Sequence, residues 1–364
     1  MRVGVLLPNW VGDVAMATPT LRTLRKNLPD ARLIGIARPY LLPLLDGTAW
    51  LDAKLSWEHK GRGRIARTWR LIQQLRAERL DLLILLRSSL SAGLLARLSG
   101  AKKTLGYTRR GFGWLLTDPI ARDFSASRPT SAVDDYLNLI GCLWSSEASP
   151  QSAGVDRRSP PATQKQLELA STPANEAAAD GIWKRLALPP ADRVMLLSTG
   201  GAFGEAKHWP TEYCVSLALR AADEFGVTTL VLCGPQERDA AAAIETAANH
   251  PQVRSLARED VSFGTTKAII RRSRLMVTTD SGPRHIASAL GTPTIVLFGP
   301  IDPAASRNYQ RDSIELTVPL DCRPCARHTC PLGHHRCMRD LTVDQVLGAV
   351  AKMLDTTTYS REAA

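Results

Sequence analysis

One stretch of the chain gathers charged and hydroxyl side chains next to glycine, directly after an apolar run. In TDSGPRHIASALGTPTIVLFGP, Asp280, Ser281, Gly282 and His285 follow a predicted strand at residues 275–279 and begin a helix. Backbone N–H groups at a helix start attract anions, and open α/β sheets bind ligands where their strands end. The spacing predicts a site for a phosphorylated ligand. A simple capped turn is the alternative, but it explains Asp280 together with His285 less well.

A second stretch, NWVGDVAMATP, places Asp13 between a predicted strand at residues 2–8 and a predicted helix at residues 15–28. Gly12 would permit a tight or left-handed backbone there. Two interpretations of Asp13 stay open. It caps the helix by accepting N–H hydrogen bonds, or it points into a cleft and acts as a general base.

Two further loops follow predicted strands in the second half of the chain. In STGGAFGEAKHWP, amides at Gly200 and Gly201 could approach a phosphate and Lys207 could add a positive charge, unless this is an ordinary surface loop. In LVLCGPQER, Glu237 could bind ribose hydroxyls, by analogy with dinucleotide sites. It could also be an acid favoured by the dipole at a helix start.

Four cysteines lie close together near the end of the chain, within residues 321–338. Cys322, Cys325, Cys330 and Cys337 have the spacing C-x2-C-x4-C-x6-C, with histidines between them. In a reducing compartment, four thiols in such a short segment favour metal ligation over disulfides, and zinc is the usual ion for four thiolates. The alternatives are an iron–sulfur cluster, disulfides, or reduced thiols packed in a proline-braced loop.

The positive charge of the chain is concentrated in its first third. Residues 1–130 hold 22 Lys and Arg against 9 Asp and Glu, whereas residues 131–364 hold 24 against 26. A basic face suits nucleic acid, anionic lipid or a phosphorylated glycan. Aromatic residues make up only 5% of the chain, which argues against stacking platforms for single-stranded nucleic acid. No apolar run reaches transmembrane length and the N-terminus lacks signal-peptide features, so we expect a cytoplasmic protein.

Strands and helices alternate twice along the chain, which predicts an α/β protein with parallel sheets. Strands are expected at residues 2–8, 32–37, 80–86, 103–107, 194–198, 228–233, 275–279 and 294–298. A basic helix at residues 59–79 would have Ile65, Trp69, Ile72 and Leu75 as its apolar face. We expect two domains facing one cleft, residues 1–170 and 171–364, the second carrying the Cys-rich loop 321–338 and a final helix near 341–354.

The motifs, in this order and spacing, resemble those of the bacterial ADP-heptose:lipopolysaccharide heptosyltransferases, glycosyltransferase family 9. The resemblance rests on NWVGDVAMATP, KHWP, GPQE, TDSGPRHIASALGTPTIVLFGP and CRPC…CPLGHHRCM, and it spans residues 1 to about 350. The opening PNWVGD is more similar to the type II branch than to the type I branch. The resemblance implies a GT-B fold of two Rossmann-like domains, with the acceptor on the first and the ADP-sugar on the second.

The resemblance also implies a reaction, the inverting transfer of a heptose from ADP-heptose to the lipopolysaccharide inner core. The catalytic base of the family corresponds to Asp13, its phosphate-binding lysine to Lys207 and its adenosine-binding glutamate to Glu237. The phosphate-side DSG and histidine correspond to Asp280, Ser281, Gly282 and His285. No DxD-like motif is found where a diphosphate would sit, so no cofactor is expected to be needed for catalysis.

A phosphorylated, membrane-embedded acceptor would give the basic first half a purpose. We therefore expect contact with the inner face of the cytoplasmic membrane and no nucleic-acid partner. The alternatives are a GT-B transferase with another nucleotide sugar or glycan acceptor and, with less support, a basic nucleic-acid-binding protein. The candidate acceptor contacts are the following basic residues: Lys60, Arg62, Arg64, Arg67, Lys102, Lys103, Arg109 and Arg110.

Overall fold

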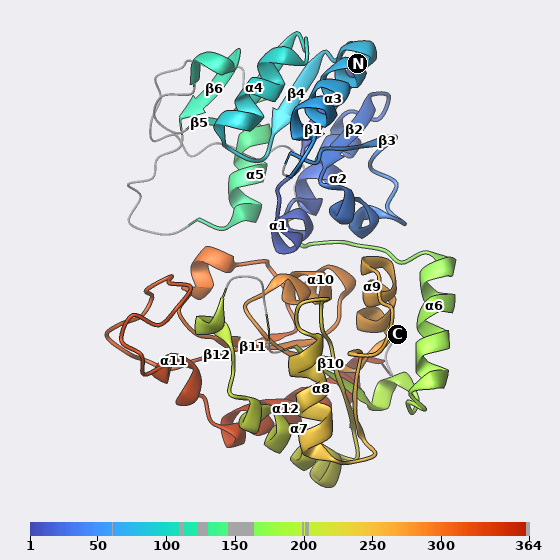
Figure 1. Ribbon diagram of the computed structural model, residues 1–364, viewed down its shortest axis with the longest axis vertical. Coiled ribbons are helices and arrows are strands. Elements are labelled where there is room, and N and C mark those ends of the chain that lie inside the picture. The colour runs from blue at the N-terminus through green and yellow to red at the C-terminus, as the bar shows by residue number, and fades with distance from the viewer. Residues whose placement is uncertain are drawn as a thin grey trace. The chain divides into compact units, whose positions relative to one another are not determined.

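A computed structural model gives the fold of the chain. It describes residues 1–59, 61–108, 113–121, 130–144, 164–198, 200 and 204–361, with side chains as far as residue 355. The contacts within the chain divide it into two units, Met1–Leu169 and Ala170–Ala364. Each unit is an α/β structure (Figure 1). No helix in the described ranges is long and apolar enough to cross a membrane.

The first unit is built on a six-stranded parallel sheet with the order β3-β2-β1-β4-β5-β6. Its strands are β1 (Arg2–Leu6), β2 (Arg32–Ala37), β3 (Ala53–Ser56), β4 (Leu82–Leu85), β5 (Lys103–Thr108) and β6 (Asp118–Ala121). Its helices are α1 (Val11–Met16), α2 (Thr18–Asn27), η1 (Pro39–Leu45), α3 (Arg64–Glu78), α4 (Leu90–Leu98), η2 (Gly113–Leu115) and α5 (Ala132–Gly141). The central strands form because their apolar runs are buried on both faces of the sheet.

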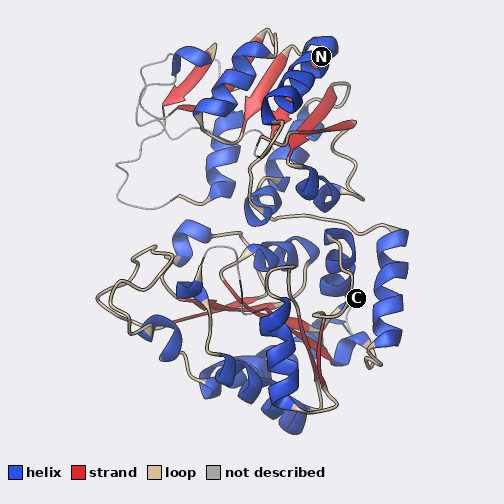
Figure 2. Cartoon of the chain, viewed as in Figure 1, coloured by secondary structure: helices blue, strands red, loops and turns tan. Residues whose placement is uncertain are grey.

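The second unit repeats this topology in the order β12-β11-β10-β7-β8-β9. Its strands are β7 (Val194–Ser198), β8 (Thr228–Val231), β9 (Val253–Ser255), β10 (Leu275–Thr279), β11 (Thr294–Phe298) and β12 (Ser313–Thr317). Its helices are α6 (Pro173–Arg185), η3 (Ala191–Arg193), η4 (Glu205–Lys207), α7 (Thr211–Phe225), α8 (Arg238–Ala248), α9 (Phe263–Arg272), α10 (Gly282–Leu290), η5 (Pro303–Ser306), α11 (Arg336–Arg339) and α12 (Val343–Arg361). Helices cover both faces of this sheet (Figure 2).

The predicted fold class is confirmed. The structure differs from the predictions in four additional strands and in one helix that is divided in two. Four strands, β3, β6, β9 and β12, were not predicted, and all four lie at the edges of the two sheets. The predicted helix at residues 15–28 is two helices, α1 and α2, and Pro19 lies in the first turn of the second.

The predicted apolar face of the basic helix is only partly buried. In α3, Leu71, Ile72 and Leu75 pack into the core of the first unit. In contrast, Ile65 is 78% exposed and Trp69 is 50% exposed, so the predicted apolar face continues beyond the part that the core covers. The first turns of α3 therefore present large apolar side chains to solvent.

Candidate active site

Each sheet has one topological switch point, where the strand order reverses direction. These points lie between β1 and β4 in the first unit and between β7 and β10 in the second. Ligands of open α/β sheets bind at the carboxyl ends of the strands beside such a point. The predicted residues follow these strands, with Asp13 after β1, Lys207 after β7 and Asp280 after β10.

Asp13 lies in the first turn of α1 and is half-buried. The N-cap residue is Trp10, in an extended conformation and without a side-chain capping bond, so the interpretation of Asp13 as the N-cap is wrong. A negative charge in a first turn is still favoured by the helix dipole. Gly12 is a helical residue without a positive φ, so of the two backbone conformations that glycine would permit there, the left-handed one is not adopted.

Two arginines that the sequence analysis did not select lie at the same edge of the first sheet. Arg87 follows β4, and its guanidinium donates to the side-chain oxygen of Asn9 at 2.7 Å and lies 5.1 Å from the centre of the Trp57 ring. Arg38 follows β2 and lies 4.9 Å from the centre of the Tyr40 ring. Asn9 belongs to the β1–α1 loop, only a few residues before Asp13.

These two arginines form a cationic pair at the carboxyl ends of β2 and β4. Burial and the charge of Arg38 lower the pKa of Arg87 from its usual value. Among the described residues, none of the ion pairs involves Arg38 or Arg87. Like charges held together at a sheet edge favour an anionic ligand. Both arginines could have been found from the sequence, because each follows a buried strand, in IGIAR and in LLILLR.

In the second unit, a buried ionic cluster forms around Asp280. Its carboxylate accepts hydrogen bonds from Lys207 Nζ at 2.8 Å, from Arg284 at 2.9 Å and from the Ser306 hydroxyl. Lys207 also donates to the carbonyl oxygen of Asp280 at 2.7 Å. Asp280 is therefore not a helix cap. Ser281, the N-cap residue of α10, makes no side-chain capping bond either, so a merely capped turn does not describe this segment.

The cluster fixes the charges of its members. Burial by itself would raise the pKa of Asp280, but the charges of Lys207 and Arg284 outweigh it and lower the pKa to about 2. Arg284 is 1% exposed, bonds the backbone of Ser306 and stacks on Phe298 at 4.7 Å. It therefore holds Asp280 in place from inside the unit.

His285 is buried beside this cluster and is neutral at neutral pH. Burial, followed by the positive charge of Arg284, lowers the pKa of its imidazole to about 3. Nδ1 lies 3.4 Å from the side-chain nitrogen of Asn308. A neutral imidazole orients neighbouring groups by hydrogen bonding and adds no positive charge to the site.

The depressed pKa of His285 makes stability depend on pH. Unfolding releases the imidazole to its ordinary pKa near 6.5, so the unfolded chain binds one more proton between about pH 6.5 and 3. The contribution of the buried neutral imidazole to the free energy of unfolding is complete above pH 6.5 and is lost as the pH falls toward 3. We expect His285→Gln to reduce the pH slope of the unfolding free energy in this window by about 1.4 kcal/mol per pH unit. Urea denaturation at several pH values measures the slope, and an unchanged slope contradicts the burial of a neutral imidazole.

Glu237 and Gly200 lie against one another at the carboxyl edge of the second sheet. The Glu237 carboxylate accepts a hydrogen bond from the amide of Gly234 at 2.8 Å, and the residue is the N-cap of α8 without a side-chain capping bond. A Cβ atom added to Gly200 would lie 2.2 Å from Glu237 Oε1. A larger residue at position 200 would therefore displace the Glu237 carboxylate. Gly201 lies outside the described residues.

The candidate acceptor contacts do not gather at one place. Arg62 and Arg64 are exposed at the start of α3. Lys102 and Lys103 lie at the amino end of β5, and Lys102 pairs with Asp81 at 2.7 Å. They are therefore at the amino ends of the parallel strands, whereas Asp13 follows the carboxyl end of β1. Lys60, Arg109 and Arg110 lie outside the described residues.

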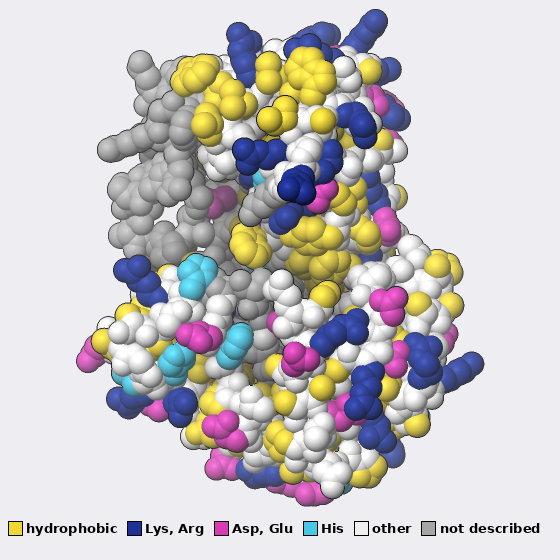
Figure 3. All heavy atoms as spheres, in the orientation of Figure 1, with side chains coloured by type: hydrophobic (Ala, Val, Ile, Leu, Met, Phe, Trp, Pro, Cys, Tyr) yellow, Lys and Arg dark blue, Asp and Glu magenta, His cyan; other side chains and the backbone are white. Residues whose placement is uncertain are grey.

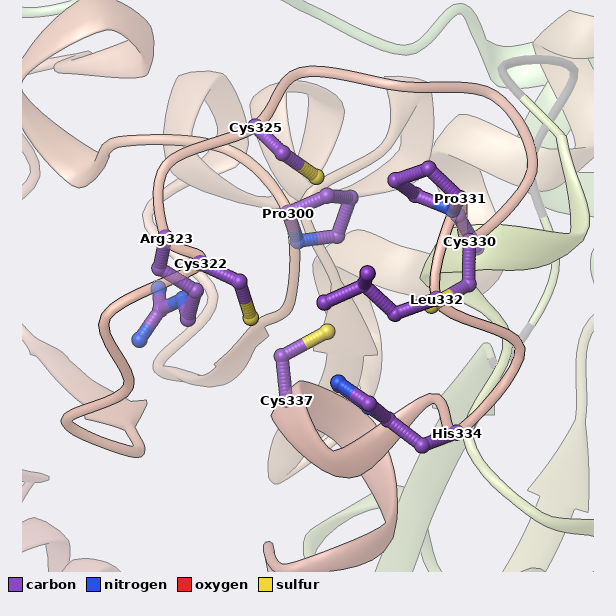
Figure 4. Close-up of a pocket in the computed structure, with 10 residues that line it drawn as sticks. Pro300, Cys322, Arg323, Cys325, Cys330, Pro331, Leu332, His334 and Cys337 are labelled. Atoms are coloured by element: carbon purple, nitrogen blue, oxygen red, sulfur yellow. The ribbon is translucent and has the colours of Figure 1, made fainter.

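The four cysteines line one small hollow of about 40 Å³ in the second unit, together with His334 and Leu332. Figure 4 shows the four cysteines arranged around the Leu332 side chain. Within the described ranges, no three His, Cys, Asp or Glu side chains are arranged to hold a metal ion. Backbone amides of His335, Leu332, Gly333 and His334 hydrogen-bond Cys330 and lower the pKa of its thiol.

Two Rossmann-like units with the same strand order, each with candidate residues at its switch point, define the GT-B class of glycosyltransferases. Solved structures agree with this fold. A family 9 glycosyltransferase from Veillonella parvula has a TM-score of 0.82 at 22% identity, with 97% of each chain covered. The Escherichia coli ADP-heptose lipopolysaccharide heptosyltransferase II has a TM-score of 0.78 at 24% identity, with both chains covered completely.

The model of glycosyltransferase family 9 (heptosyltransferase) matches residues 68–336, and the chain belongs to this family. Among curated relatives, lipooligosaccharide heptosyltransferase 2 of Campylobacter jejuni is 23% identical over 357 residues, covering 97% of this chain and 98% of the relative. The chain is therefore a glycosyltransferase.

Proposed function

We propose that the protein transfers a heptose from ADP-heptose to the inner core of lipopolysaccharide, with inversion at the anomeric carbon. The observation that carries this proposal is the buried Lys207–Asp280 pair at the start of α10. It fixes a cation beside helix N–H groups, an arrangement suited to a departing diphosphate. Membership of family 9 and the heptosyltransferases among its relatives support heptose as the sugar.

In this proposal, the second unit binds the donor and the first binds the acceptor. Lys207 and the amides at Ser281 and Gly282 stabilise the charge that grows on the diphosphate as the bond from C1 to its oxygen breaks. Glu237 holds the ribose hydroxyls of the nucleotide. Asp280, Arg284 and His285 position these groups, because Arg284 is buried in ion pairs and His285 is uncharged at neutral pH.

Asp13 acts as the general base in the first unit. It accepts the proton of the acceptor hydroxyl while the hydroxyl oxygen forms a bond to C1 on the face opposite the departing ADP. A carboxylate is a weak base, so proton transfer comes late, after the hydroxyl has become acidic. No step of this scheme requires a metal ion or cofactor.

Donor selectivity tests the proposal. Release of ADP or of another nucleoside diphosphate is measured with a heptose-primed, deeply truncated lipopolysaccharide as acceptor. ADP-heptose is compared with ADP-glucose and UDP-glucose. We expect acceptor-dependent turnover with ADP-heptose. Turnover only with another sugar nucleotide would leave the protein a GT-B transferase and overturn heptose as its sugar.

Gly200→Ala is predicted to weaken ADP binding about tenfold, because the new Cβ displaces the Glu237 carboxylate from the ribose side of the site. The matched control is Gly348→Ala, since a Cβ there meets nothing within 4 Å. Titration calorimetry with ADP measures both. Equal ADP affinities for the two variants would contradict the binding of the nucleotide by Glu237.

Arg87→Ala is predicted to raise the acceptor KM about tenfold or more while leaving the ADP affinity unchanged. The proposed acceptor carries phosphate and carboxylate groups, and Arg87 with Arg38 offers a cationic pair. Arg87 is hydrogen-bonded to Asn9, in the loop that leads to Asp13. Steady-state kinetics with the acceptor varied tests this. Arg22→Ala, which removes an exposed ion pair with Glu168, is the control in the same unit. An unchanged acceptor KM in Arg87→Ala would mean that Arg38 and Arg87 do not bind the acceptor.

We further propose that the four cysteines hold a structural metal centre, with zinc as the first candidate and an iron–sulfur cluster as the second. All four cysteines line one hollow, and amide hydrogen bonds lower the pKa of Cys330. Burial raises the pKa of Cys337, and a metal ion would have to draw the thiols together around one point. Metal analysis of the purified protein should find about one zinc per chain. Absence of any stoichiometric metal would leave the cysteines as reduced thiols.

The acceptor places the enzyme at a membrane. Lipopolysaccharide core is assembled on a lipid anchor, so we propose that the protein works at the cytoplasmic face of the inner membrane. The basic first third of the chain and the exposed Arg62 and Arg64 support this location.

A further inference from the structure

The outer sides of α3 and α4 carry a row of large apolar side chains in contact with solvent. On α3, Ile65 and Trp69 are spaced four residues apart. On α4, Leu90, Leu94 and Leu98 repeat the same spacing and are 45%, 42% and 39% exposed. Side chains four residues apart share one face of a helix. With Trp114 of η2, which is 73% exposed, they form what we call the apolar ridge.

Contacts between the elements make the ridge continuous. Arg76 of α3 donates to the carbonyl oxygen of Leu98 at 2.8 Å, and its guanidinium lies 6.0 Å from the centre of the Trp69 ring. Arg76 therefore joins the rows on α3 and α4. On the other side of α4, the Leu115 side chain of η2 packs against Gly93, which brings Trp114 next to this helix.

The core of the first unit does not require these side chains. The inner faces of α3 and α4 already contribute Leu71, Ile72, Leu75, Leu95 and neighbouring alanines to the core against the sheet. Isolated exposed leucines are common, but a row across three neighbouring elements marks an interaction surface. Figure 3 shows apolar side chains over this part of the first unit with Lys and Arg around them.

The surroundings of the ridge are strongly basic. Residues 61–108 contain ten Lys and Arg and two acidic residues. Both acids are already paired, Glu78 with Arg32 and Asp81 with Lys102. In the described part of the chain, Arg70 and Arg97 take part in none of the ion pairs and are exposed. The segment thus keeps a large excess of positive charge beside the ridge, because it has ten Lys and Arg and only two acidic residues.

We propose that the apolar ridge docks on a bilayer surface that contains anionic phospholipid. Tryptophan and leucine side chains enter the boundary between headgroups and acyl chains, and flanking arginines bind lipid phosphates. This inference rests on the proposed function, because a glycolipid acceptor requires an enzyme that approaches the membrane. A second copy of the chain fits less well, since two equally basic surfaces repel each other.

The two contributions respond differently to salt. Attraction between arginines and a charged bilayer is screened within about 10 Å at moderate ionic strength, whereas the burial of apolar side chains is not. Binding should therefore require anionic lipid and should weaken as salt is added. It should also be lost when the apolar side chains are removed with the charge left intact.

Co-sedimentation of the full chain with lipid vesicles tests the proposal. Vesicles of phosphatidylcholine with phosphatidylglycerol are compared with phosphatidylcholine alone. One variant, Trp69→Ser with Leu94→Ser, removes apolar surface. A second, Arg70→Glu with Arg97→Glu, reverses charge. The control, Arg193→Glu with Arg258→Glu, makes the same charge change on exposed residues of the second unit.

The wild type and the control should bind the anionic vesicles, and each ridge variant should bind about tenfold more weakly. Ridge variants that bind like the wild type would overturn the proposal. So would a wild type that ignores vesicles, or one that uses these residues to bind duplex DNA or RNA instead. Thermal melting of every variant shows whether it is folded. If the apolar variant is not folded, the charge variant alone still tests the proposal.

Activity separates this inference from the proposed function. The ridge variants should lose turnover with an acceptor embedded in vesicles and keep the wild-type kcat/KM with a delipidated, water-soluble core oligosaccharide. Equal losses with both acceptors would contradict docking as the cause. If neither the wild type nor any variant turned over either acceptor, the proposed function would be contradicted. Vesicle binding would still test the docking of the ridge.

Discussion

Asp13→Asn is expected to lower kcat by about 10²- to 10⁴-fold, which is the usual contribution of a general base. Asparagine has nearly the same shape and can occupy the same position in the first turn of α1, but it cannot accept the hydroxyl proton. The KM values for donor and acceptor should change little, since the lost interaction belongs to the transition state. Initial rates of ADP release measure the effect.

The control for this substitution is Asp30→Asn, which removes the same charge from an exposed position of the first unit. Its kcat should equal that of the wild type. If Asp13→Asn also kept the wild-type kcat, Asp13 would stabilise the start of α1 through the helix dipole and another group would be the base.

Asp280→Asn is expected to produce the largest change in stability. The carboxylate lies between Lys207 and Arg284, which are 7% and 1% exposed, and its removal leaves two buried cations facing each other. Breaking a buried ion pair on one side costs about 3–5 kcal/mol. ADP affinity should fall as well, because Lys207 loses the group that holds it beside α10. Urea denaturation and ADP titration measure the two effects.

Asp344→Asn is the matched control, since its carboxylate is 82% exposed and pairs with Arg220 on the surface of the same unit. Little change in stability or ADP affinity is expected there, as for most surface ion pairs. Equal stabilities for Asp280→Asn and Asp344→Asn would contradict the view that the buried cluster organises the donor side.

Buried strands were predictable from the sequence and edge strands were not. The runs that became β7, β10 and β11 are continuously buried and mainly apolar, because helices cover both faces of a parallel sheet. The four missed strands border only one neighbour, and three of them, β3, β6 and β12, are partly exposed and mix polar with apolar residues. Nothing in their periodicity separates such segments from loops.

The candidate site was predictable where a motif joins a strand to a helix. Asp280 and Ser281 were found in this way. The pairing of Asp280 with Lys207, 73 residues earlier, depends on β7 and β10 being neighbours in the sheet, which no local pattern reveals. Arg38 and Arg87 were missed for the same reason, since they come together only through the order of β2, β1 and β4.

Helix periodicity alone did not predict the environment of the first turns of α3. Ile65 and Trp69 fit the spacing of an apolar face, and Ile72 and Leu75 do pack into the core. Periodicity tells which residues share a face but not how far the neighbouring elements extend along it. The exposed part of that face became visible only with the fold, and it is the origin of the proposed lipid surface.

Mass spectrometry of the acceptor tests the central claim most directly. Deeply truncated, heptose-primed lipopolysaccharide is incubated with the wild-type protein and ADP-heptose, and its mass is compared with that of samples lacking protein or donor. The account predicts an increase of one heptose residue, seen only when both are present and absent with Asp13→Asn. An acceptor of unchanged mass, with or without ADP release, would contradict heptosyl transfer by this protein.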